Sequence, residues 1–101
     1  MVKVNLTKQS INDIDHIAEF ISKDSEKYAA IQTLRFFEAA KTLEHQPEIG
    51  RIVPELNNQN IRELIEGNFR IIYRIKNLNI IDILTVHHSK WLISNNPIFK
   101  K

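Results

Sequence analysis

The stretch IRELIEGNFRIIYRI, residues 61–75, has the pattern of two β-strands joined by a tight turn. β-Branched and aromatic residues dominate it, and Glu-Gly-Asn at 66–68 is typical of a turn. In the second strand, alternation separates two sets of side chains: Phe69, Ile71, Tyr73 and Ile75 on one face, and Arg70, Ile72, Arg74 and Lys76 on the other. We therefore expect one apolar face and one basic face, which Arg62 joins if the pairing register permits.

The segments around this hairpin complete a small sheet and begin a helical layer. The hairpin strands are predicted at 61–65 and 69–76, and a third strand follows at 80–88 after the turn Asn-Leu-Asn. A short first strand is predicted at 2–6, where apolar and polar residues again alternate. Residues 10–22 have apolar side chains at three- and four-residue spacing, which indicates an amphipathic helix.

Capping residues define where the helices begin. Thr7 or Ser10 is the expected N-cap of the first helix, and Asp24 or Ser25 that of a second, longer one. The predicted buried face of the second helix consists of Ala30, Ile31, Leu34, Phe37, Ala40 and Leu43. The connection is so short that the helices must run antiparallel. Residues 45–60 are rich in Pro, Gly, Asn and Gln and are predicted to form a loop.

The element order β-α-α-β-β-β predicts an α+β fold, in which a helical hairpin packs on one face of a small, mainly antiparallel sheet. No repeat, low-complexity tract or interdomain linker interrupts the 101 residues, so we expect a single domain over 1–101. The other face of the sheet is expected to meet water or a partner.

Composition is that of an ordinary globular protein, with 43% hydrophobic and 26% charged residues. The chain has no cysteine, which excludes disulfide frameworks and favours a reducing compartment. It shows no secretory signal and no apolar run that would span a bilayer, so we expect a cytoplasmic protein with no membrane partner. Residues 1–60 carry seven Lys/Arg against nine Asp/Glu, and residues 61–101 carry seven against three. This asymmetry favours an acidic or polyanionic partner for the C-terminal part, although a solvated sheet gives the same count.

Four short motifs occur in a characteristic order. They are L-x(3)-P-x-x-G-R at Leu43, Pro47, Gly50 and Arg51, R-E-L at 62–64, aromatic-R-I-I-Y at 69–73, and V-x-H followed by a basic residue from Val86 and His88 onward. Together they resemble the RelE/ParE superfamily of toxins from bacterial type II toxin-antitoxin modules, most closely its ParE-like, plasmid-stabilisation branch. The resemblance covers nearly the whole chain and implies the same fold.

The resemblance also implies a toxin that a co-expressed antitoxin neutralises. ParE-like toxins trap DNA gyrase on cleaved DNA, which needs only a binding surface. RelE-like toxins cleave mRNA in the ribosomal A site, which needs an acid, a base and cations that stabilise the phosphorane. We expect the ParE-like function, with the mRNA endonuclease as one alternative and a non-toxic binding paralogue as another.

The nuclease alternative has an incomplete set of candidate residues. Arg62, Arg70 and Lys90 are candidates for phosphate stabilisation, and His87 or His88 for proton transfer. RelE-like enzymes, however, carry a tyrosine or histidine in the segment after the last strand, and residues 91–101 contain neither. Whether the protein is an enzyme stays uncertain on this basis, and the sequence leans toward inhibition by binding.

Two sets of residues are candidates for partner binding. Arg62, Arg70, Arg74 and Lys90 are the expected target-binding residues, unless the arginines are only the solvated face of a sheet, with Arg74 paired to Asp82. For the antitoxin, the expected contacts are Phe20, Tyr28 and Phe36 beside the helical stripes, the basic residues Arg62, Arg70 and Arg74, and an exposed sheet edge.

No metal site or cofactor is predicted. His87 and His88 are adjacent in a strand and therefore face opposite sides of the sheet, and no third ligand lies at suitable spacing. The expected partners are proteins or nucleic-acid assemblies: the antitoxin, and gyrase or the ribosome with its mRNA.

Overall fold

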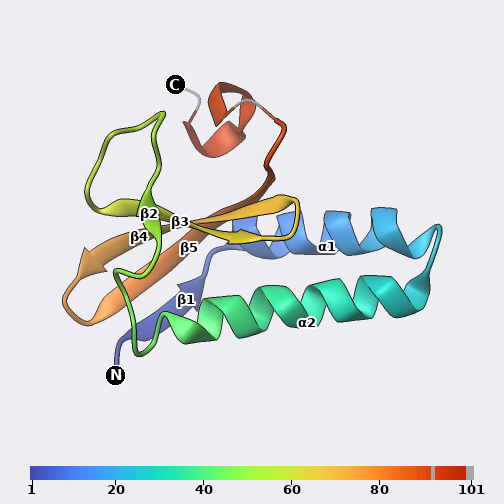
Figure 1. The fold of residues 1–101 in the computed structure, drawn as a ribbon, viewed down its shortest axis with the longest axis horizontal. Coiled ribbons are helices and arrows are strands. Elements are labelled where there is room, and N and C mark those ends of the chain that lie inside the picture. Colours follow the sequence, from blue (N-terminus) through green and yellow to red (C-terminus); the bar gives the residue numbers. More distant parts are fainter. Residues whose placement is uncertain (92, 100–101) are drawn as a thin grey trace.

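The computed structural model describes residues 1–91 and 93–99, which form two helices against a five-stranded sheet (Figure 1). The elements are β1 (Lys3–Leu6), α1 (Lys8–Ser22), α2 (Glu26–Thr42), β2 (Arg51–Ile52), β3 (Ile61–Glu66), β4 (Phe69–Asn77), β5 (Ile80–His88) and the 3-10 turns η1 (Ile93–Asn95) and η2 (Pro97–Phe99). The strand order is β1-β5-β4-β3-β2, with β1 parallel to β5 and the other pairs antiparallel. The predicted α+β fold and antiparallel meander are confirmed. Within the described residues, no helix is both long and apolar enough to cross a membrane.

Hydroxyl side chains fix the start of each helix. Thr7 Oγ1 accepts a hydrogen bond from the Ser10 amide, and Ser25 Oγ accepts one from the Tyr28 amide. Each bond satisfies a backbone donor that has no partner inside its helix. Thr7 and Ser25 are therefore the N-caps, and the short link between the helices makes them an antiparallel hairpin (Figure 1).

The buried face of α2 differs from the predicted one. The helix buries Ala29, Gln32, Phe36 and Ala40. Of the predicted face, Ala40 and the C-cap residue Leu43 are buried as predicted, whereas Ala30, Ile31, Leu34 and Phe37 are exposed. Phe36 lies in the core, where its ring meets that of Phe69 edge to face at 5.3 Å. Apolar residues surround most of this helix, so its sequence allows two stripes, and contact with the sheet selects the one that contains Phe36.

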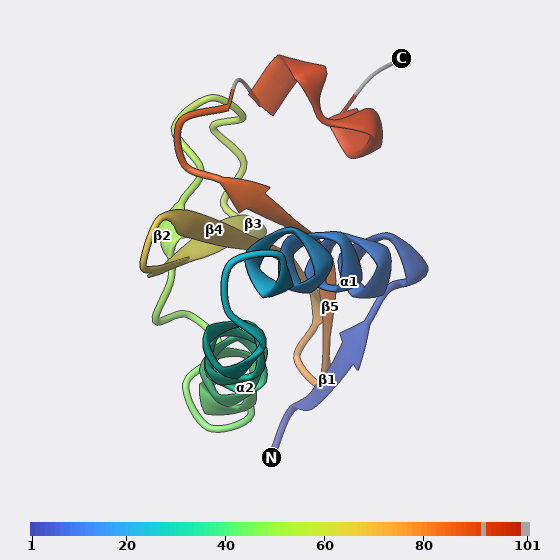
Figure 2. The ribbon, with the colours of Figure 1, turned by 90° about the vertical axis from the view of Figure 1, so that its right-hand side faces the viewer.

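The sheet is buried on both faces. On the helical side, Ile71 and Tyr73 pack against Ile14, Ile17 and Phe36. On the opposite side, a second cluster joins Ile72 to three side chains from outside the central strands, namely Val53, Ile93 and Phe99. Figure 2 shows the C-terminal turns on the side of the sheet away from α2. Alternation in β4 is as predicted, but the expectation that its second face is open to water or a partner is wrong.

Strand β2 lies inside the predicted 45–60 loop and forms one edge of the sheet. It pairs only with Arg62 and Glu63 of β3. The preceding Gly50 leaves no room for a side chain, since a Cβ there would lie 2.6 Å from both the Glu63 carbonyl oxygen and the Tyr73 hydroxyl. This close approach explains why glycine precedes the strand.

Candidate partner-binding surfaces

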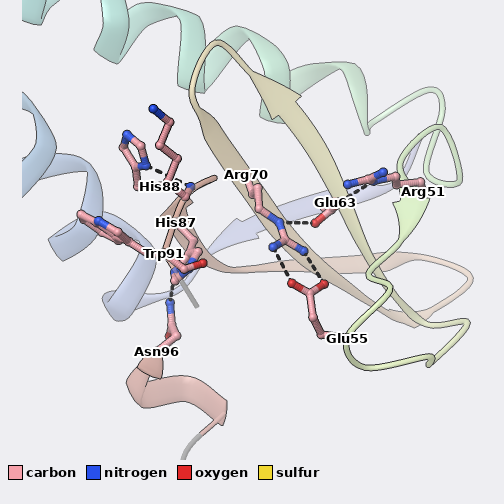
Figure 3. Close-up of polar contacts among 9 residues, drawn as sticks. Arg51, Glu55, Glu63, Arg70, His87, His88, Trp91 and Asn96 are labelled. Atoms are coloured by element: carbon pink, nitrogen blue, oxygen red, sulfur yellow. Dashed lines mark hydrogen bonds and ion pairs between the residues drawn. The ribbon is translucent and has the colours of Figure 1, made fainter. Parts of the chain in front are cut away.

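Arg70 lies at the centre of a four-residue ion-pair cluster on the face of the sheet away from the helices (Figure 3). Its Nε donates to Glu63 Oε1 at 2.6 Å, and its two terminal nitrogens donate to the Glu55 carboxylate at 2.8 Å each. Arg51 Nε donates to the second oxygen of Glu63 at 2.5 Å. The Arg70 side chain is only 7% exposed, so its predicted place on an open basic face is wrong.

The ion pairs within the cluster stabilise the charged forms of Glu55 and Arg70. The pKa of the Glu55 carboxyl is lowered to about 2, mainly by hydrogen bonds from Arg70. Partial desolvation acts in the opposite direction and raises the pKa. The same pair raises the pKa of the Arg70 guanidinium further above its ordinary value. Because all three nitrogens are engaged and the side chain is buried, Arg70 is poorly placed to bind a phosphate or an acidic partner.

Arg62 holds the loop that precedes β2. Its terminal nitrogen NH1 donates to the Gly50 carbonyl at 3.0 Å and to the Glu48 carbonyl at 3.4 Å, and its Nε donates to the Gln59 carbonyl at 3.2 Å. It pairs with Tyr73 across the strands, which places it on the helical side of the sheet, so it does not join the face of Arg70. Arg62 is only partly exposed, and its guanidinium organises the backbone here.

The Tyr73 hydroxyl connects to the same loop. It donates to the Pro47 carbonyl at 2.9 Å and accepts from the Gly50 amide at 3.0 Å. Burial is the main cause that raises the pKa of Tyr73. A fully buried phenol with both hydrogen bonds satisfied is a structural group and is poorly placed for proton transfer to a substrate.

Arg74 forms the predicted pair with Asp82. The two residues lie directly opposite each other in β4 and β5, and their side chains meet at 3.2 Å. The Arg74 side chain is 47% exposed, so the contact is a surface ion pair.

The two histidines of β5 have different surroundings. His87 is buried; its Nε2 lies 3.0 Å from the Trp91 carbonyl, and its Nδ1 lies 3.0 Å from Asn96 Nδ2 (Figure 3). Because the amide nitrogen of Asn96 is a donor and the carbonyl an acceptor, these contacts assign the proton of His87 to Nε2. Both ring nitrogens are thus engaged. His88 is half-buried, and its Nδ1 accepts from the Lys90 amide at 3.1 Å.

Lys90 is exposed on the turn after β5 and is free of the ion pairs found among the described residues. Trp91 beside it is 58% exposed and stacks at a tilt against His88, with 5.3 Å between ring centroids. Trp91 was not among the site residues predicted from the sequence, although exposed tryptophans are enriched at protein interfaces. In residues 1–91 and 93–99, no three His, Asp or Glu side chains are grouped to hold a metal ion.

The outer surface of the helical hairpin is strongly apolar. Phe20 is 71% exposed and Tyr28 is 48% exposed, as predicted, but Phe36 is 2% exposed and its predicted role as a surface contact is wrong. A shallow groove of about 530 Å³ runs between the helices; the residues that line it are Ala18, Glu19, Ser22, Ala29, Ala30, Thr33, Leu34 and Phe37. Leu34 and Phe37, assigned to the core from sequence, are therefore surface residues.

A second hollow lies at the other side of α1. It measures about 310 Å³ and is almost entirely apolar; the side chains around it are His16, Ile17, Phe20, Ile21, Phe69, His88 and Trp91. Phe20 and Trp91 thus belong to one surface that connects the helical hairpin with the end of β5.

Comparison with known proteins supports a common origin with one toxin family. The family model described as "ParE toxin of type II toxin-antitoxin system, parDE" matches residues 4–91. Among solved structures, a chain of the chromosomal ParDE TA system from P. aeruginosa superposes with a TM-score of 0.73 at 22% sequence identity, over 89% of this chain and 98% of that one. No curated protein matches in sequence.

Proposed function

The chain belongs to the ParE toxin family of type II toxin-antitoxin systems, and from this premise we propose that it inhibits DNA gyrase in the cytoplasm by binding it, until a cognate antitoxin covers it. The observation that carries the proposal is the family match over residues 4–91, which extends from β1 to the turn after β5. Inhibition by binding requires exposed side chains but no catalytic group.

The polar geometry supports binding over RNA cleavage. The groups selected for nuclease chemistry are largely committed to the fold: Arg70 to two carboxylates, Arg62 to loop carbonyls, and His87 to Trp91 and Asn96. General acid-base catalysis requires a group within hydrogen-bond reach of the substrate, with a position free to exchange the proton. Lys90 is exposed and, with its neighbour Trp91, is the target contact that we propose.

The antitoxin contact that we propose lies on the helical hairpin. Ile31, Leu34 and Phe37 recur at three-residue spacing on the exposed side of α2, beside the groove between the helices. An amphipathic helix buries its apolar side in such a groove through residues at similar spacing. Phe20, near the end of α1, and Tyr28, near the start of α2, are exposed and extend the proposed contact toward the turn between the helices.

Induced expression in a growing culture tests the target. We expect growth arrest with an SOS response, and inhibition of supercoiling when the purified protein is added to gyrase. Early translation arrest with mRNA cleaved in the ribosomal A site would overturn the gyrase proposal in favour of the endonuclease. Normal growth despite a folded, abundant protein would identify a non-toxic paralogue.

The contribution of the proposed target contact is measured in the same assays. We expect a double substitution, Lys90→Gln with Trp91→Ala, to abolish growth arrest while the melting temperature changes little, because both side chains are exposed. Lys3→Gln, an exposed lysine on the edge strand β1, is the matched control and should remain toxic. Full toxicity of the double variant would remove these residues from the target surface.

A further inference from the structure

One arginine is oriented by the fold and still has unoccupied donors. Arg51 lies in the edge strand β2, and its side chain is 63% exposed. Its Nε is held by Glu63, whose side chain is completely buried (Figure 3). Its two terminal nitrogens make no hydrogen bond to any residue that the structure describes. A guanidinium has a planar fork of donors that matches a carboxylate, so this side chain is prepared to bind an anion.

The other arginines of the sheet lack this freedom. Arg70 donates through all three nitrogens to Glu55 and Glu63, and it is buried. Arg62 donates to main-chain carbonyls around β2. Arg74 donates to Asp82 through a terminal nitrogen. Arg51 is therefore the arginine of the described strands whose carboxylate partner holds Nε and leaves both terminal nitrogens exposed.

The backbone around Arg51 is fixed from two sides. The Gly50 amide donates to the Tyr73 hydroxyl at 3.0 Å, and the Gly50 carbonyl accepts from Arg62 at 3.0 Å. Strand pairing places Arg51 directly opposite Glu63. Because neither the backbone nor the inner part of the side chain needs to be ordered on binding, the entropic cost of an added ion pair is small.

Building on the antitoxin-binding function proposed above, we propose that Arg51 anchors an acidic residue of an extended antitoxin segment at the β2 edge of the sheet. Strand β3 continues for residues 64–66 beyond its pairing with β2. Strand β4 pairs with this part on one side, and on the side of β2 no strand of the described chain pairs with it. Ile65 is on the same face as Glu63 and is 57% exposed. A strand with an acidic and an apolar residue two positions apart matches this surface, because side chains at this spacing point to the same face, where the acidic one meets Arg51 and the apolar one covers Ile65.

The local charge favours a peptide carboxylate over a nucleic acid. The four side chains of the cluster carry two positive and two negative charges, and Glu55 is 45% exposed. Nucleic acids bind through several phosphates that are neutralised by several cations. One open guanidinium near an exposed carboxylate fits a single acidic side chain better than a phosphate backbone.

The experiment compares Arg51→Gln and Arg51→Lys with wild type in calorimetric titrations against the product of the adjacent gene. We expect Arg51→Gln to weaken antitoxin binding about tenfold or more, the loss typical of a charge-assisted hydrogen bond. Arg51→Lys should restore only part of the affinity, because lysine lacks the paired planar donors of a guanidinium. Lys76→Gln removes an equal charge from an exposed position of β4 and should leave the affinity unchanged. The melting curve of Lys76→Gln should coincide with that of wild type, because Lys76 is exposed. Arg51→Gln should melt at a lower temperature, because the buried Glu63 loses one of its two partners, and the titrations are therefore run at a temperature at which all variants are fully folded.

A second titration separates this inference from the antitoxin function itself. The probe is the peptide Thr-Glu-Thr-Val-Thr-Glu, which has its acidic and apolar side chains on one face, followed through NMR shifts of the Arg51 Nε–H and the backbone amides of β3, with Thr-Gln-Thr-Val-Thr-Gln as its neutral counterpart. Failure of the wild-type protein to bind the adjacent gene product would reject the antitoxin function. The anion site would still be supported if the acidic peptide alone caused NMR shifts and these shifts were lost in Arg51→Gln. Equal binding of both peptides, unchanged antitoxin affinity in Arg51→Gln, or a loss of affinity for duplex DNA alone would overturn the proposal.

Discussion

Glu63 is a carboxylate that is buried completely but not left unpaired. One oxygen accepts from Arg51 and the other from Arg70, at 2.5 and 2.6 Å. Such a site is costly to disturb, because removal of one member leaves another charge buried without its partner. Glu63 therefore holds the buried guanidinium of Arg70 and orients the exposed side chain of Arg51 at the edge of the sheet.

Substitution of Glu63 by alanine measures this dependence. We expect the free energy of unfolding to fall by about 3–5 kcal/mol, since Arg70 stays buried and retains only Glu55. Urea denaturation followed by circular dichroism gives the value. Glu38→Ala, at an exposed position of α2, is the control and should change stability by less than about 0.5 kcal/mol. Similar losses in the two variants would show that the cluster does not stabilise the fold.

Glu55 makes stability depend on pH. Arg70 lowers its pKa to about 2 from the 4.5 of an unperturbed glutamate. A carboxyl whose pKa is lower in the folded state contributes stability above the unfolded pKa, and this contribution is lost as the pH falls from 4.5 toward 2. Since the side chain is 45% exposed, solvent screening limits the contribution to about 1 kcal/mol. Wild type should therefore exceed Glu55→Gln in unfolding free energy at pH 6, and the difference should shrink at pH 2.5; a difference that is constant with pH would contradict this linkage.

Single residues were predictable where their partners are neighbours in a hairpin. The pair of Arg74 and Asp82 follows from one short turn between adjacent strands, and the structure confirms it. Arg70 was not predictable in the same way, because one of its partners, Glu55, lies in a loop whose path no local pattern specifies. The role of Arg51 was still harder to predict, because its orientation depends on Glu63, whose burial cannot be read from the sequence.

At the scale of elements, periodicity located the helices and central strands but did not decide how α2 is rotated. Apolar residues occupy two overlapping stripes, one through Ala29, Phe36 and Ala40 and one through Leu34 and Phe37. The predicted face included the second stripe together with Ala40 and Leu43, and only Ala40 and Leu43 of it are buried. The stripe that packs on the sheet is instead the one in which Ala29 and Ala40 flank the ring of Phe36. The bulkier side chains Leu34 and Phe37 are exposed and available to a partner.

Two alanine substitutions on α2 test this rotation. We expect Phe36→Ala to reduce the free energy of unfolding by about 3–5 kcal/mol, because it opens a cavity beside Phe69. Leu34→Ala, two residues away but 58% exposed, should change it by less than about 0.5 kcal/mol. Chemical denaturation of both variants gives the comparison, and a larger loss for Leu34→Ala would support the stripe predicted from sequence.

At the scale of the whole molecule, the sequence predicted one covered face of the sheet and the structure has two. The meander of β3, β4 and β5 and the helical layer follow from local periodicity and short connections, whereas the parallel pairing of β1 with β5 and the short strand β2 do not. The second layer does not, because it consists of a loop and two 3-10 turns whose few apolar residues, such as Val53 and Ile93, show no regular spacing. This layer encloses Arg70 and His87, so it also decides which of the candidate residues a partner can reach.

Asn96 is the residue that most directly attaches this layer to the sheet. Its side-chain amide donates to Thr85 Oγ1 at 3.1 Å and to His87 Nδ1 at 3.0 Å, and all three residues are buried. We expect Asn96→Ala to lower the free energy of unfolding by about 1–3 kcal/mol, because it leaves a buried ring nitrogen without its donor. Local detachment should also speed hydrogen exchange at the amide of Val53, which bonds the Ile61 carbonyl beneath the same layer. Asn95→Ala, at the exposed neighbouring position, is the matched control. If both variants exchange at the wild-type rate and unfold alike, the outer layer is held by its apolar contacts alone, and the buried histidine contributes nothing to its attachment.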